Sequence, residues 1–233
     1  MPKTTDYKTL DRVKESVSTK QSYSRANIIG LVIGFIFFAV SLVVAHTHQL
    51  KGFQLTIFRD FNNLSNSYKT LALWLTEGLG AGYAIAACVI IPLILKRFKL
   101  AWRFFFTAGG AGAVMYIAKK IAREPRPAVL LHGHLHVRAI ETGLDGYPSG
   151  HETIATALAL TLWLILPKKW RWLAILWIIV VAISRIYVGD HTPNDIVGGF
   201  AIGLMAVCVV RLLPLKIAKQ LHLDDEKLLD KGF

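Results

Sequence analysis

The segment IIGLVIGFIFFAVSLVVA, residues 28–45, carries no charge and is long enough to cross a bilayer as a single helix. Spanning a hydrocarbon core of roughly 30 Å takes about 20 apolar residues in a helix. Five further apolar segments follow it, at residues 71–95, 100–118, 154–166, 172–183 and 197–213. The pattern predicts an all-α polytopic membrane protein, a bundle of six transmembrane helices.

Composition indicates the same class of protein. Hydrophobic residues make up 54% of the 233 residues and charged residues 18%, with a mean hydropathy of +0.46. An ordinary soluble domain carries about 25% charged residues. The fourth and fifth segments are short, and they reach spanning length only when they extend to His151 and Val188. That extension places His151 and Arg185 at the membrane edge.

The basic residues indicate an orientation, because cytoplasmic loops of membrane proteins are enriched in lysine and arginine. They concentrate before the first segment, between the second and third, between the fourth and fifth, and after the sixth. We expect a cytoplasmic arm (residues 1–26), a membrane domain (27–215) and a cytoplasmic tail (216–233), with both termini inside. The net charge of +12 follows from this bias, so we expect membrane lipids and no nucleic acid as partners.

A second group of cations falls on the outer, periplasmic or extracellular, side, where topology does not require it. Its members are Lys119, Lys120, Arg123, Arg126, Arg138 and Arg185. For Lys120 and Arg123 we prefer a simple explanation, in which the side chains reach to the membrane interface. The other four predict an anionic ligand at the outer face.

A helix start with phosphate-binding character lies at residues 148–153 on that side. Ser149 and Glu152 form a capping-box pattern, which has a purely structural explanation. A helix N-terminus with free N–H groups and a small residue, Gly150, is also a ready anion site. His151 then stands beside the bound anion.

The same arrangement recurs before the sixth segment. Thr192 is positioned to cap a helix, Pro193 suits its first position and Asp195 its third. Two roles are open for Asp195. It either only stabilises the start of the helix, or it also binds one ring nitrogen of His191, four residues earlier, and so leaves the other nitrogen unprotonated. Arg185, at the end of the fifth segment, has a planar fork that matches two phosphate oxygens.

Two more cations complete the expected site. Lys119 ends the third segment, and Arg126 lies between Pro125 and Pro127, which break the helix and fix the direction of the chain. We expect both side chains to face the same anion.

These motifs closely resemble the signature of the type 2 phosphatidic acid phosphatase superfamily at every signature position. They are K-x6-R-P at residues 119–127, P-S-G-H at residues 148–151 and S-R-x5-H-x3-D at residues 184–195. The six predicted segments resemble the membrane branch of that family. Vanadium-dependent haloperoxidases resemble the signature as well, but so apolar a chain favours the membrane phosphatases.

The resemblance implies an enzyme, a phosphatase that uses no metal and no other cofactor. It implies that His191 attacks phosphorus to form a phosphohistidine, that Asp195 orients His191, and that His151 protonates the leaving group. It also implies a set of residues that hold the phosphoryl oxygens: Lys119, Arg126, Ser149, Gly150 and Arg185.

The implied substrates are lipids with a terminal phosphate or pyrophosphate, such as undecaprenyl pyrophosphate, phosphatidylglycerophosphate or phosphatidic acid. The chain resembles bacterial enzymes, so we expect it in the cytoplasmic (inner) membrane. Two alternatives remain open at this point. One is a lipid phosphotransferase that uses the same intermediate, and the other is a non-enzymatic protein that binds or translocates lipids.

Some features have no assigned role. Glu77, inside the second segment, either serves the site or pairs with an outer lysine. His132, His134 and His136 would share one face of an extended segment, where they hold a metal or contact substrate or headgroups. The sequence does not determine the oligomeric state.

Overall fold

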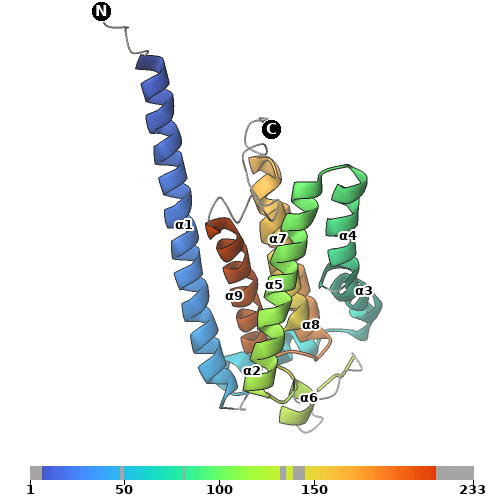
Figure 1. Ribbon diagram of the computed structural model, residues 1–233. Coiled ribbons are helices and arrows are strands. Elements are labelled where there is room, and N and C mark those ends of the chain that lie inside the picture. The colour runs from blue at the N-terminus through green and yellow to red at the C-terminus, as the bar shows by residue number, and fades with distance from the viewer. Residues whose placement is uncertain (1–6, 48–49, 81, 132–134, 139–144, 214–233) are drawn as a thin grey trace, which may run out of the picture.

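The computed structural model of the chain describes residues 7–47, 50–80, 82–131, 135–138 and 145–213, with side chains described from residue 25 onward. Within these residues every regular element is helical and none is a strand. The predicted all-α class is therefore confirmed. Figure 1 shows the helices side by side in a bundle, with short elements gathered at one end of it.

Four helices form the main body of the bundle. α1 (Tyr7–Ala45) lies along α9 (Pro193–Leu212), and α9 also packs against α7 (Gly150–Ile165) and α5 (Phe98–Ala122). Figure 1 shows the N-terminal part of α1 projecting beyond the other helices. Because α1 runs without a break past residue 26, the boundary expected between arm and membrane domain is not a break in the helix.

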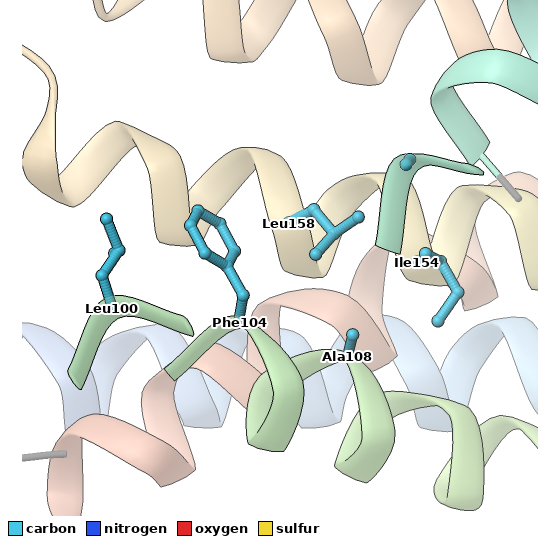
Figure 2. Close-up of a cluster of buried hydrophobic side chains, with 6 residues drawn as sticks. Leu100, Phe104, Ala108, Ile154 and Leu158 are labelled. Atoms are coloured by element: carbon cyan, nitrogen blue, oxygen red, sulfur yellow. The ribbon is translucent and has the colours of Figure 1, made fainter. Parts of the chain in front are cut away.

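The core between α4 (Gly82–Ile94), α5 and α7 is built from apolar side chains. Figure 2 shows Leu100, Phe104 and Ala108 of α5 facing Ile154 and Leu158 of α7. Their spacing of four residues on each helix puts them on one face, which is the pattern of a packed helix pair. This contact holds α7 in place, so its first turn has a fixed position at the end of the bundle.

Glycines let α7 and α9 approach closely. A Cβ atom on Gly203 would lie 2.6 Å from Cβ of Thr156, and one on Gly199 would lie 2.7 Å from the carbonyl oxygen of Ser149. Any larger residue would push the two helices apart. Gly199 and Gly203 therefore serve the packing of α7 against α9. The close approach also lets the N–H of Ser149 donate to the carbonyl oxygen of Asp195 at 3.0 Å, which joins the two helix starts.

The segment predicted at residues 71–95 is not one continuous helix but a bent pair of helices, which together are long and apolar enough for one span. α3 (Lys69–Gly80) and α4 (Gly82–Ile94) are inclined by 47°. A bend of this size interrupts the backbone hydrogen bonds of a helix. At this bend the carbonyl oxygen of Leu79 accepts a hydrogen bond from the indole N–H of Trp177 instead, at 2.8 Å. At the bend, a Cβ atom on Gly80 would lie 2.8 Å from Cβ of His151. The bend thus brings the end of α3 against a predicted site residue.

The short helix α2 (Gly52–Asn62) covers the end of α8 (Trp172–Tyr187). Phe58 is fully buried there in a cluster with Leu50 and Ile186. The side-chain amide of Asn62 donates to the carbonyl oxygens of His136 and Tyr187, at 3.0 and 3.1 Å. α2 therefore fixes part of the connection that follows α6 (Pro127–Leu130) to the end of α8.

Helices long and apolar enough to cross a membrane are fewer than the six predicted. In the described residues they are Arg25–Ala45, Lys168–Tyr187 and Pro193–Leu212, and the bent pair formed by residues 66–80 and 82–94 makes up to four. α7 is apolar but shorter, at 16 residues. Large apolar side chains such as Phe35, Trp74 and Ile94 are exposed on the outside of the bundle, as expected for a surface in contact with lipid.

Candidate active site

The three stretches of polar residues meet at one end of the bundle. α5 ends at Ala122, α7 begins at Gly150, and the turn between α8 and α9 covers residues 188–192. Figure 1 shows these ends together at the bottom of the bundle. The basic connections at residues 95–97 and 166–171 lie at the opposite ends of the same helices.

The turn between α8 and α9 determines where His191 lies. Gly189 has φ +81°, and a Cβ atom there would lie 2.8 Å from the carbonyl oxygen of His136, so the position requires glycine. The N–H groups of Asp190 and His191 donate to the carbonyl oxygen of Arg185, at 3.3 and 3.4 Å. The turn folds back on the end of α8, and His191 is only 1% exposed.

The start of α9 fixes one side of the His191 ring. The N–H of Asp195 donates to Oγ1 of Thr192 at 3.1 Å, and the N–H of Thr192 donates to Oδ2 of Asp195 at 2.7 Å. The predicted cap at Thr192 is confirmed as a complete capping box. The same Oδ2 atom lies 3.4 Å from Nδ1 of His191. Capping the helix and holding the histidine are therefore compatible roles for Asp195.

Burial and nearby cations keep His191 uncharged. Burial, followed by the positive charges of Arg185, Lys119 and Arg126, holds the pKa of His191 well below its ordinary value. A neutral imidazole keeps a lone pair on one nitrogen, which a nucleophile needs. The same three cations act electrostatically on His151, and His151 acts on His191. The structure thus brings both histidines and the three cations into one cluster.

Asp190 is a central residue of this cluster that the sequence analysis missed. Its carboxylate accepts hydrogen bonds from Nη1 of Arg126 at one oxygen and from Nη2 of Arg185 at the other. Its Oδ2 atom also lies 3.4 Å from Nε2 of His191. The side chain of Asp190 is 1% exposed, and two guanidinium groups compensate its buried charge. An acid directly before the motif histidine was the available signal, but nothing in the motif marks that position.

Arg126 and Lys119 are linked through the loop before α7. Nε of Arg126 donates to Oδ1 of Asp145 at 3.2 Å, and Nζ of Lys119 donates to the carbonyl oxygen of Asp145. Partial burial works against the charge of Asp145, but the positive charges of Arg126 and Lys119 outweigh it and keep the pKa of Asp145 below its usual value. Arg126 and Pro127 begin α6, so the helix break predicted around Arg126 is confirmed.

The start of α7 holds Ser149, Gly150 and His151. Ser149 caps the helix as predicted, with Oγ accepting from the N–H of Glu152 at 3.4 Å. The other half of the predicted capping box is wrong, because the Glu152 side chain turns into the bundle and its Oε1 accepts from Oγ1 of Thr156 at 3.2 Å. Gly150 is the first residue of α7.

Glu77 contacts His151. Its Oε1 atom lies 3.3 Å from Nε2 of His151, and the side chains of Glu77 and His151 are 49% and 16% exposed. Of the two roles left open for Glu77, the geometry favours a place beside the site. The bend between α3 and α4 makes this contact possible, because it turns the end of α3 toward the start of α7.

A second buried acid lies behind Asp195. Burial, followed by the negative charge of Asp195, raises the pKa of Glu124 to about 9, so its carboxyl is protonated at neutral pH. Oε2 of Glu124 and Oδ1 of Asp195 are buried, and neither atom has a hydrogen-bond partner among the described residues while both carboxyls are charged acceptors. A proton shared between the two carboxyls satisfies both atoms.

Comparison with known proteins shows the family of the chain. A family model described as the PAP2 superfamily matches residues 100–218, which include the site residues predicted from the motifs and more than half of the chain. The chain belongs to the PAP2 superfamily. The family resemblance inferred from the motifs is confirmed, and the chain is an integral membrane phosphatase of this family.

Three PAP2 relatives illustrate the range of the similarity. An undecaprenyl-diphosphatase of Sulfolobus acidocaldarius is 28% identical over 176 residues, which are 74% of this chain and 84% of that protein. The undecaprenyl-diphosphatase BcrC of Bacillus subtilis is 28% identical, over 64% of this chain and 78% of that protein. Sphingosine-1-phosphate phosphatase 2 of Mus musculus is 33% identical, over 52% of this chain and 34% of that protein.

Two crystal structures have the same PAP2 fold. LpxE of Aquifex aeolicus aligns with a TM-score of 0.63 and 23% identity, over 70% of this chain and 96% of that one. A transmembrane PAP2-type phosphatidylglycerolphosphate phosphatase of Bacillus subtilis aligns with a TM-score of 0.60 and 20% identity, over 77% and 92%. At these identities the likeness concerns the fold.

One outer cation predicted to bind an anion serves the PAP2 scaffold instead. Arg138 donates to Oδ1 of Asn66 and to the carbonyl oxygens of Asn62, Leu64 and Tyr187, all at 2.7–2.8 Å, and its guanidinium lies 4.2 Å from the Tyr187 ring centre. Those bonds tie the connection after α6 to the helices beneath it. Lys120 and Arg123 are exposed, in line with the interface role preferred for them.

The histidine-rich stretch is only partly described. His132 and His134 lie outside the described residues, and His136 is exposed, with its N–H donating to Oδ1 of Asn62 at 2.8 Å. In the part of the chain that the structure describes, no three His, Cys, Asp or Glu side chains form a group arranged to hold a metal ion. The role of this stretch is still a hypothesis.

Proposed function

We propose that this PAP2 protein removes the terminal phosphate from a lipid phosphate or pyrophosphate through a phosphohistidine on His191. One observation carries the proposal. Nδ1 of His191 faces Asp195, while Nε2 faces the carboxylate that bridges Arg126 and Arg185. The nitrogen left free by Asp195 therefore points at the two cationic side chains best suited to hold phosphoryl oxygens.

In the first step Nε2 of His191 attacks phosphorus. The bond from phosphorus to the leaving oxygen breaks, and its electron pair leaves with that oxygen, which takes a proton from His151. Burial and the three cations disfavour that proton, so the negative charges of the bound phosphoryl group and of Glu77 have to stabilise it. Asp195 stabilises the positive charge that develops on the imidazole of His191. Arg126, Arg185 and Lys119, with the N–H groups at the start of α7, stabilise the charge on the equatorial phosphoryl oxygens.

In the second step water attacks the phosphohistidine. His151, which lost its proton in the first step, accepts one from the water, the bond between phosphorus and Nε2 breaks, and inorganic phosphate leaves. The position of Glu77 beside His151 supports this exchange of protons, since a carboxylate stabilises the protonated imidazole. No step requires a metal ion.

A lipid is the substrate class that best fits the surroundings of the site. An apolar groove of about 240 Å³ runs between α3 and α8, lined by side chains such as Leu71, Leu75 and Val180, and it reaches Ser184, next to Arg185. An acyl or prenyl chain in this groove would bring its phosphate to the arginines. Because two of the relatives are named undecaprenyl-diphosphatases, we rank undecaprenyl pyrophosphate first, ahead of phosphatidylglycerophosphate and phosphatidic acid.

We further propose that the site opens at the outer face of a bacterial cytoplasmic membrane. The basic connections lie at the opposite end of the bundle, which is the expected cytoplasmic side. Both termini are then cytoplasmic, and six segments cross the membrane. A cysteine introduced at Asp145, near the site, should react with an impermeant maleimide on intact cells, whereas one introduced at Lys168 should not.

Phosphate release by the purified protein tests the proposed reaction. The substrates are the three candidate lipids, with and without a chelator, in detergent micelles. We expect release from at least one lipid, insensitive to the chelator. Phosphate that leaves the lipid only when an alcohol acceptor is present would support a phosphotransferase, and lipid binding with no loss of phosphate would support a binding or translocating protein.

A further inference from the structure

Asp190 occupies the place where the proposed function puts a phosphoryl group. Its two carboxylate oxygens accept hydrogen bonds from Arg126 and Arg185. Its Oδ2 atom lies 3.4 Å from Nε2 of His191. A phosphoryl group about to react needs the same contacts, namely guanidinium donors and a nucleophilic atom at about 3–3.5 Å from phosphorus.

A carboxylate and a phosphate cannot share this position. Both are anions that accept hydrogen bonds from the same N–H groups, and the side chains of Asp190, Arg126 and Arg185 are 1%, 6% and 1% exposed, so solvent screens them little. Two anions brought together here repel each other more strongly than they would in water. Binding of a phosphoryl group therefore requires the Asp190 carboxylate to turn away from at least one arginine.

We propose that Asp190 is an internal competitor of phosphate that determines how tightly the site binds a phosphoryl group. The carboxylate holds the forks of Arg126 and Arg185 in position, gives way when a substrate binds, and returns to help expel the product. The proposal rests on the proposed function in one respect, that these two arginines bind the phosphoryl group.

Competition of this kind discriminates between substrate and product. A lipid phosphate gains binding energy from its apolar tail, and that energy offsets the displacement of Asp190. Inorganic phosphate has no tail, so it binds weakly and leaves after each turnover. Asp190 is therefore a specificity-determining residue of the site, in addition to the motif residues.

The direction in which Asp190→Asn changes the affinity for inorganic phosphate separates this proposal from a purely structural role of Asp190. If Asp190 competes with phosphate, Asp190→Asn binds inorganic phosphate more tightly, by about tenfold or more, because the repulsion is removed and the arginines remain. If Asp190 only orients the arginines, the same variant binds phosphate more weakly. Inhibition constants for inorganic phosphate and orthovanadate, measured against turnover of a lipid phosphate, distinguish the two.

A binding measurement independent of turnover uses the His191→Ala background. Asp190→Asn leaves two buried guanidinium groups without this counter-charge, so the melting temperature should fall in phosphate-free buffer and recover when inorganic phosphate is added. We expect a larger phosphate-dependent rise than in the parent. Equal rises in the two proteins, or a smaller rise in the variant, would overturn the proposal.

Asp145→Asn is the matched control, since Asp145 also contacts Arg126 but its side chain is 55% exposed. Removing its charge should change the inhibition constant for phosphate by less than about threefold, because solvent screens an exposed pair. Should Asp190→Asn not fold, a crystal structure of the unmodified protein with orthovanadate decides. We expect the Asp190 carboxylate to have left Arg126 or Arg185, and its continued contact with both beside bound vanadate would refute the idea.

These outcomes are separate from those of the proposed function. Tighter phosphate binding by Asp190→Asn in a protein that hydrolyses none of the candidate lipids would support the competitor and count against the substrates. Lipid hydrolysis by the parent, with an inhibition constant for phosphate that Asp190→Asn leaves unchanged, would support the proposed function and count against the competitor.

Discussion

The two histidines of the candidate site share three nearby cations but differ in burial and in the acids that they face. His191 is 1% exposed and has a carboxylate oxygen 3.4 Å from each ring nitrogen. The side chain of His151 is 16% exposed and faces Glu77, which is itself half exposed. A nucleophile has to be fixed and uncharged before the reaction, whereas an acid has to regain a proton from solvent in every cycle. The difference in burial therefore matches the different proposed roles of the two residues.

The largest effect is expected from His191→Ala. Without the nucleophile no phosphoenzyme forms, and the rate of phosphate release should fall by a factor on the order of 10⁴ or more. The measurement is phosphate release from a lipid phosphate, together with acid-labile ³²P retained on the protein. His46→Ala, at an exposed histidine at the end of α1, is the control. If His191→Ala kept more than about 1% of the activity, which is two orders of magnitude above the expected residual activity, His191 would not be the nucleophile.

A smaller and more selective loss is expected from His151→Ala. General acid catalysis contributes about 10² to 10⁴ in rate, and only where the leaving group needs a proton. The first turnover of a lipid phosphate should slow within that range, while the first turnover of p-nitrophenyl phosphate, whose leaving group departs unprotonated, should slow much less. Rapid-quench measurement of the first turnover separates this step from the later attack of water. Equal losses with the two substrates would mean that His151 binds the phosphoryl group and does not donate a proton.

Glu77→Gln tests whether the exposed side of His151 matters. The variant keeps the shape of the side chain but removes the charge 3.3 Å from Nε2, which stabilises the protonated form of His151, so kcat with a lipid phosphate should fall by roughly tenfold. Glu77→Asp keeps the charge and should recover part of the loss. If Glu77→Gln matched the parent with both lipid and aryl phosphates, Glu77 would be a residue of the lipid-facing surface only.

Much of the candidate site could be predicted because a membrane restricts where charged residues lie. Five of the predicted site residues lie at or beyond the ends of apolar segments: Lys119, Arg126, His151, Arg185 and His191. The order of those segments was therefore enough to assign all five to one end of a bundle. The caps at Ser149 and Thr192 follow from local hydrogen-bonding rules and were predicted for the same reason.

The remaining features depend on contacts between distant parts of the chain. Asp190 meets Arg126 only because Gly189 turns the chain back on α8. Arg138 was expected among the anion-binding cations, but the carbonyl oxygens that accept its hydrogen bonds belong to two other segments of the chain, at residues 62–64 and at Tyr187. The bend after Gly80 is stabilised by Trp177, which lies 98 residues from Leu79. No local pattern of residues encodes such contacts.

The smallest effect on activity is expected at Glu124, the acid behind Asp195, and its contribution is best measured through the free energy of unfolding. The pKa of Glu124 is raised from 4.5 to about 9, so between these values the folded protein keeps a proton that the unfolded chain releases. This contribution to the free energy of unfolding is complete below about pH 4.5 and is lost as the pH rises toward 9. Its slope is at most about 1.4 kcal/mol per pH unit.

Glu124→Gln removes that titration and keeps a donor for Asp195, since an amide N–H replaces the carboxyl O–H. Melting temperatures in detergent from pH 5 to 9 should therefore fall more steeply for the parent than for Glu124→Gln, while phosphate release at pH 7 stays within a few-fold of the parent because Asp195 still holds His191. Glu124→Ala, which leaves Asp195 without this partner, should lose more activity than Glu124→Gln. Parallel melting curves would mean that Glu124 is charged in the folded protein, and the buried surroundings of His191 would then hold one more negative charge than proposed.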